Sequence, residues 1–173
     1  MSFNVTVNQN RKLHFPESRH IAARTIWMNF PDKPLKLTHF LERMIDWLPR
    51  GRERFLIISN WNTYPPHPLA FFETVRLGCG ERRHIIDAPG LLIESDDGAK
   101  CQEFSESPNT STLVGFALLV VNFDWQAYLI AKNETSHVYL GDEFISFSTA
   151  DDSKLAEVFA LAARFELKTR ESK

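Results

Sequence analysis

The chain has 173 residues, of which 43% are hydrophobic and 24% are charged, and its formal net charge is −2 at pH 7. This composition is typical of a folded globular chain and excludes an intrinsically disordered one. The longest apolar run, Leu113 to Val121, is far shorter than the roughly 20 residues needed to cross a bilayer. Residues 1–7 show no signal-peptide pattern. We therefore expect one globular domain over residues 1–173, in the cytoplasm and without a membrane segment.

The charge is divided unevenly along the chain. Residues 1–85 hold 13 Lys and Arg against 7 Asp and Glu, whereas residues 86–173 hold 7 against 15. The small net charge therefore conceals a basic half and an acidic half, which would prefer partners of opposite charge.

The N-terminal part predicts a strand, a helix and a second strand. Phe3–Val7 alternates apolar and polar residues and predicts a short strand. The apolar Ile21–Phe30 favours neither a helix nor a strand. Apolar residues spaced three and four apart predict a helix over Pro34–Leu48, with Asp32 as its N-cap. The Ile-rich run Phe55–Ser59 predicts a strand buried on both faces.

The middle of the chain predicts shorter elements. A short helix is expected from Leu69 until Gly78, and strands are expected at Arg83–Asp87 and Leu91–Ser95. The apolar run Thr110–Val121 fits a helix or a buried strand, and its Ser/Thr-rich start after a proline favours the helix.

The C-terminal part predicts a meander and a helix. Strands are expected at Ala127–Lys132, His137–Leu140 and Glu143–Ser148, joined by short turns as in an antiparallel meander. Asp151 or Asp152 caps the last helix. The predicted buried stripe of that helix consists of Leu155, Val158, Phe159, Ala162 and Phe165.

Helices and strands alternate irregularly, unlike the βα repeats of a doubly wound sheet. We therefore predict a single-domain α+β fold: a mixed or antiparallel sheet with three to four helices packed on it, and a C-terminal β-meander followed by a helix.

The sequence offers no strong catalytic or ligand motif. None of the six His residues pairs with another ligand at a usual metal spacing, and no phosphate-binding glycine pattern is present. We predict no metal and no cofactor, and we favour a protein that is not an enzyme.

Two alternatives to protein binding remain open. A small-ligand binder or an enzyme of unknown reaction would use His84 and Asp87 with Arg52 or Arg82, although strand positions 84 and 87 point to opposite faces. Nucleic-acid binding would use the cluster of Arg50, Arg52 and Arg54. The second alternative is disfavoured because acidic residues are interleaved with these arginines and the pI is about 6.3.

The leading hypothesis is a non-catalytic protein-binding module of a bacterial type, such as an immunity-type neutraliser of a basic protein or toxin. Its expected contact surface consists of carboxylates at the turns and helix start of the predicted meander, which would gather at one end of the sheet: Glu134, Asp142, Glu143, Asp151 and Asp152. Such an acidic rim would steer a basic protein partner towards the surface. A homodimer is also open.

Overall fold

The computed structural model describes residues 6–7, 13–14, 24–49, 54–60, 74, 78, 91–95, 110–131, 135–141 and 143–172. The strands and helices are β1 (Thr6–Val7), β2 (Leu13–His14), β3 (Arg24–Asn29), α1 (Pro34–Trp47), β4 (Arg54–Asn60), β5 (Leu91–Ser95), α3 (Thr110–Asn122), β6 (Gln126–Ala131), β7 (His137–Leu140), β8 (Phe144–Thr149), α4 (Asp152–Arg164) and β9 (Thr169–Ser172). None of the helices in these ranges is long and apolar enough to span a membrane.

One antiparallel sheet organises the fold. Its seven strands follow the order β5-β4-β6-β7-β8-β3-β9, and all neighbouring strands are antiparallel. β1 and β2 pair separately as a two-stranded sheet. The predicted α+β class and the C-terminal meander followed by a helix are confirmed.

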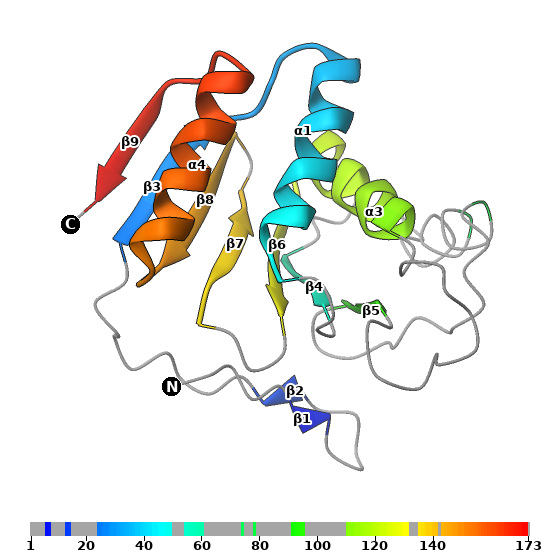
Figure 1. The fold of residues 1–173 in the computed structure, drawn as a ribbon. Coiled ribbons are helices and arrows are strands. Elements are labelled where there is room, and N and C mark those ends of the chain that lie inside the picture. Colours follow the sequence, from blue (N-terminus) through cyan, green and yellow to red (C-terminus); the bar gives the residue numbers. More distant parts are fainter. Residues whose placement is uncertain are drawn as a thin grey trace, which may run out of the picture.

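The helices α1, α3 and α4 lie on the same side of the large sheet, with α1 between the other two (Figure 1). Their apolar stripes pack on the alternate strand residues that face them, and these residues form one core cluster. Fully buried Phe40, Phe116, Trp125 and Phe147 are among its largest side chains. We call the opposite side of the sheet the helix-free face, since none of these three helices covers it.

The most regular predicted elements are confirmed with small changes at their ends. The helix predicted over Pro34–Leu48 ends at Trp47, and residue 110 begins a helix rather than a buried strand. Asp32 was the wrong N-cap, because Lys33 occupies that position without a side-chain hydrogen bond. Phe159 was wrongly placed in the buried stripe of α4: it is 40% exposed, while Leu161 is buried.

Two strands of the large sheet were missed for different reasons. β3 lies within the segment that favoured neither state, and it becomes a strand by pairing with β8 and β9, which are distant in sequence. The short polar sequence of β9 has no apolar alternation to reveal it. The strand predicted at Arg83–Asp87 lies outside the described residues, as does most of the helix predicted from Leu69, of which only Thr74 and Gly78 are described as helical.

Candidate functional site

Two of the predicted acidic site residues lie at the start of α4. Asp151 is the N-cap, and its Oδ1 accepts hydrogen bonds from Ser153 Oγ at 2.7 Å and from the Ser153 backbone N–H at 2.8 Å. These hydrogen bonds hold the pKa of the Asp151 carboxyl below its ordinary value. Asp152 Oδ1 accepts from Arg24 Nη1 at 2.9 Å. Both carboxylates therefore have partners within the chain.

Glu143 lies at the other end of β8 from these two aspartates. It immediately precedes Phe144, the first residue of the strand, whereas Asp151 follows the last residue, Thr149, by two positions. A strand of this length spans about 20 Å. The structure therefore does not bring Glu143 together with Asp151 and Asp152 as the sequence led us to expect. Glu134 and Asp142 lie outside the described residues, and binding by these five residues stays a prediction.

Of the alternative site residues, only Arg54 is described, because Arg50, Arg52, Arg82, His84 and Asp87 lie outside the described ranges. Arg54 is only 2% exposed, and its Nη1 donates a hydrogen bond to the backbone oxygen of Ile45 at 3.2 Å. That carbonyl belongs to the last turn of α1, where a positive charge is favourable. Arg54 thus points into the interior and adds nothing to a basic surface.

The most distinctive surface lies on the helix-free face. Trp27 on β3 is opposite Ser146 on β8, Ser146 is opposite Tyr139 on β7, and Tyr139 is opposite Tyr128 on β6. Residues opposite one another in antiparallel strands point to the same face. The residues flanking each of them in sequence belong to the core under the helices, so these four side chains point away from the helices.

The aromatic rings on this face form a continuous row. The ring centroids of Tyr128 and Tyr139 are 4.9 Å apart, those of Tyr139 and Phe144 are 5.8 Å apart, and those of Phe144 and Trp27 are 4.9 Å apart. All three pairs are tilted rather than stacked face to face, an arrangement favoured by the ring quadrupoles. We call Tyr128, Tyr139, Phe144 and Trp27 the aromatic row. It crosses the strands from β6 to β3.

Gly141 makes part of this arrangement possible. It is buried in the turn before β8, and its backbone N–H donates to the backbone oxygen of Phe144 at 2.8 Å. A Cβ atom at residue 141 would lie 2.9 Å from Phe144 Cζ and 3.1 Å from Tyr139 Cε1. The absence of a side chain at this position lets both rings settle close to the backbone.

Hydroxyl and imidazole groups border the aromatic row. Thr25 Oγ1 and Ser148 Oγ share a hydrogen bond of 2.9 Å beside it. His137 lies next to Tyr128, with ring centroids 6.3 Å apart. Burial lowers the pKa of the His137 imidazole below its ordinary value, so this residue is neutral at pH 7.

The row is accessible to a partner to different degrees along its length. Tyr128 is 37% exposed, and the other three rings are partly exposed. At the β8 end, the exposed residue Glu143 directly precedes Phe144, and its backbone oxygen accepts a hydrogen bond from Asn29 Nδ2 at 3.4 Å. The face therefore offers partly exposed aromatic surface to a partner.

The sequence alone did not predict the aromatic row. The signal is present in the strand patterns: Tyr128 and Tyr139 each lie between buried apolar neighbours, which marks them as residues of the opposite face. What the sequence does not give is the placement of β3 next to β8, which brings Trp27 to the row.

The described residues form an α+β protein with an antiparallel sheet, helices on one side and an aromatic row on the other. No protein-family model, curated protein or solved structure matches the chain. Within the described ranges, no group of three or more His, Cys, Asp or Glu residues could hold a metal ion.

Proposed function

We propose that this protein is a non-catalytic cytoplasmic module that binds another protein through the helix-free face of its sheet. The observation that carries the proposal is the aromatic row, in which four rings follow one another at centroid distances of 4.9, 5.8 and 4.9 Å. Trp and Tyr are enriched among the residues that dominate binding energy at protein interfaces.

The packing of the row favours binding in a second way. A Tyr or Trp side chain offers a large contact area with only two rotatable side-chain bonds, so its ordering costs little entropy. Here Tyr139 and Phe144 are further held by their close approach to Gly141. The rings are therefore ordered before a partner arrives, which lowers the cost of association.

The chemistry of the row supports a partner with a basic surface. Lys and Arg side chains are attracted to the faces of Trp and Tyr rings, and most strongly where water is excluded. The acidic C-terminal half of the chain points in the same direction, and neutralisation of a basic toxin is the form of this function that it favours.

The test is affinity capture from the native extract with three versions of the tagged chain: wild type, Tyr128→Ala and Phe159→Ala. Phe159 is a matched control, because it is 40% exposed against 37% for Tyr128 but lies on α4, on the other side of the sheet. The proposal is supported by a basic protein that binds wild type and Phe159→Ala and binds Tyr128→Ala at least about tenfold more weakly. Its capture must also persist after nuclease treatment.

Two outcomes would overturn the proposal. One is a partner that binds all three versions equally. The other is preferential binding of a single-stranded oligonucleotide, with an affinity that falls steeply with salt, because bases also stack on exposed aromatic rings.

A further inference from the structure

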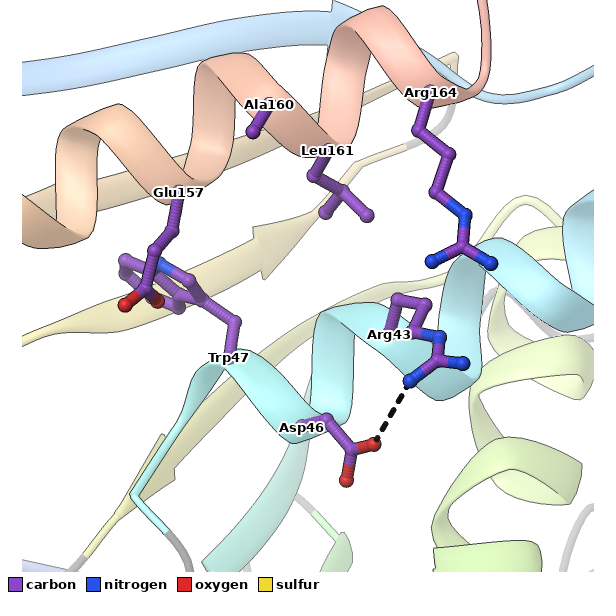
Figure 2. A pocket seen from close by; sticks show the side chains of 7 residues that line it. All are labelled: Arg43, Asp46, Trp47, Glu157, Ala160, Leu161 and Arg164. Carbon is purple, nitrogen blue, oxygen red and sulfur yellow. Dashed lines mark ion pairs between the residues drawn. The ribbon is translucent and has the colours of Figure 1, made fainter.

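A groove runs between α1 and α4 on the side of the molecule away from the aromatic row. It is an open groove of about 270 Å³, and its floor is formed by the nearly buried side chains of Trp47 and Leu161 (Figure 2). Charged side chains from both helices stand around this floor. The groove is lined by Arg43, Asp46, Trp47, Glu157, Ala160, Leu161 and Arg164.

Two of these charged side chains form no ion pair within the described part of the chain. Arg43 Nη1 lies 4.0 Å from Asp46 Oδ2, but neither Glu157 nor Arg164 makes an ion pair with any described residue. Arg164 packs its guanidinium over the ring of Phe165, at 5.9 Å from the centroid. Both side chains are exposed and available to another molecule.

Glu157 and Arg164 are related by the geometry of α4. They are seven residues apart, which corresponds to two turns and about 10.5 Å along the helix axis, so they lie on the same face. The midpoint between them falls at Ala160 and Leu161. A two-fold axis through this midpoint would place Glu157 of one chain next to Arg164 of a second copy, and the reverse.

We propose that this face binds a second copy of the chain, with α4 antiparallel to α4 of the partner subunit. Glu157 then meets Arg164 of the partner subunit, and Arg164 meets Glu157 of the partner subunit. A symmetric contact of this kind is the arrangement found in most homodimers. The charge pattern is what selects a second copy as the occupant, because it is complementary to itself.

The neighbouring residues fit this contact. Ala160 is exposed and small at the centre of the face, where two packed helices approach to about 8–10 Å. Arg43 points to the same end of the groove as Arg164 (Figure 2). It therefore adds a second guanidinium near Glu157 of the partner subunit. Because exposed ion pairs contribute little individually, the dimer is weak and reversible.

The dimer does not depend on the proposed function. Its contact lies on the helix side of the sheet and leaves the aromatic row of each subunit accessible. A dimer would present two such faces, so a partner with repeated sites would bind with increased avidity. Dimerisation through α4 and partner binding by the aromatic row concern different surfaces and are measured separately, so either can fail without the other.

The test is analytical ultracentrifugation over a wide range of concentrations with wild type, Glu157→Arg, Arg164→Glu and the double variant that carries both changes. Each single reversal places like charges opposite one another at both symmetric contacts and weakens dimerisation by about tenfold or more. The double variant restores opposite charges and dimerises like wild type. An equimolar mixture of the two single variants forms a heterodimer, because one chain then offers two positive and the other two negative residues.

Lys168→Glu provides the control, since it reverses an exposed charge beyond the end of α4. It leaves dimerisation unchanged. Arg164→Gln replaces Arg164→Glu if the reversal unfolds the chain, as judged by circular dichroism, and weakens dimerisation less. The proposal is overturned if wild type stays monomeric at every concentration, if the single reversals dimerise like wild type, or if their mixture associates no more than either alone.

Discussion

Gly141 lies directly beneath the ring of Phe144, so that a Cβ atom at residue 141 would come within 2.9 Å of Phe144 Cζ. Real Cβ atoms essentially never lie this close to a neighbour, so any side chain at this position displaces the ring. The turn before β8 and the aromatic row are thus coupled.

Gly141→Ala is expected to shift Phe144 and Tyr139 and to lower the free energy of unfolding by about 1–3 kcal/mol. Near-ultraviolet circular dichroism reports the ring environment, and urea unfolding reports the stability. Gly78→Ala is the matched control, because Gly78 is helical and a Cβ there meets nothing within 4 Å. That variant should gain about 0.5–1 kcal/mol. Unchanged ring signals in Gly141→Ala would contradict the coupling.

Asp124 lies two residues beyond the end of α3 and has a left-handed backbone conformation, with φ of 52°. The backbone N–H of Trp125 donates to the backbone oxygen of Val120 at 2.9 Å, which closes a Schellman motif around residue 124. Glycine adopts this conformation without steric cost, so Asp124→Gly should raise the free energy of unfolding by about 0.5–1 kcal/mol. A fall in stability on urea unfolding would show that the Asp124 side chain has a stabilising role.

The half-buried His137 should make stability depend on pH. Because its pKa is lowered in the folded state, the unfolded chain takes up a proton first as the pH falls below about 6.5. The contribution of His137 is therefore fully present above that pH and is lost as the pH falls towards 5. The depressed pKa of Asp151 acts only below about pH 4, outside this window.

The measurement for His137 is the free energy of unfolding of wild type and of His137→Gln at several values between pH 7 and pH 5. As the pH falls, wild type should lose more of its free energy of unfolding than His137→Gln does. A difference that stays constant would show that His137 is not responsible, since the other five His residues are present in both proteins.

Arg54 should act on stability and not on nucleic-acid binding. Arg54→Ala removes the hydrogen bond to Ile45 and leaves a cavity in a buried position, at a cost of about 2–4 kcal/mol in the free energy of unfolding. The exposed residue Lys168 serves as control, and Lys168→Ala should change stability by less than about 0.5 kcal/mol. A variant of normal stability that loses affinity for single-stranded DNA would contradict this assignment.

Local sequence pattern was sufficient to predict a helix or strand where the element is long or where short turns join it to its neighbours. The apolar spacing of α1 and the close succession of β6, β7 and β8 predicted those elements correctly, because both signals arise within a few residues. The position of β3 could not be predicted in this way. Its pairing with β8 joins Arg24 to Thr149 and depends on the whole chain.

The same distinction applies to the candidate surfaces. Counting charges placed carboxylates along the C-terminal half but could not show that Asp152 pairs with Arg24 or that β8 separates Asp151 from Glu143. The sequence places Arg54 in a basic cluster, but the register of β4 directs its side chain into the interior. The aromatic row requires the order of four strands, and that order is a property of the tertiary structure.

If the aromatic row binds a basic protein, as we propose, the affinity of the captured partner must differ between Tyr128→Ala and Phe159→Ala. Titration calorimetry at a fixed salt concentration should show an affinity at least about tenfold weaker for Tyr128→Ala and a wild-type affinity for Phe159→Ala. Equal affinities for the two variants, or a loss confined to Phe159→Ala, would contradict the claim.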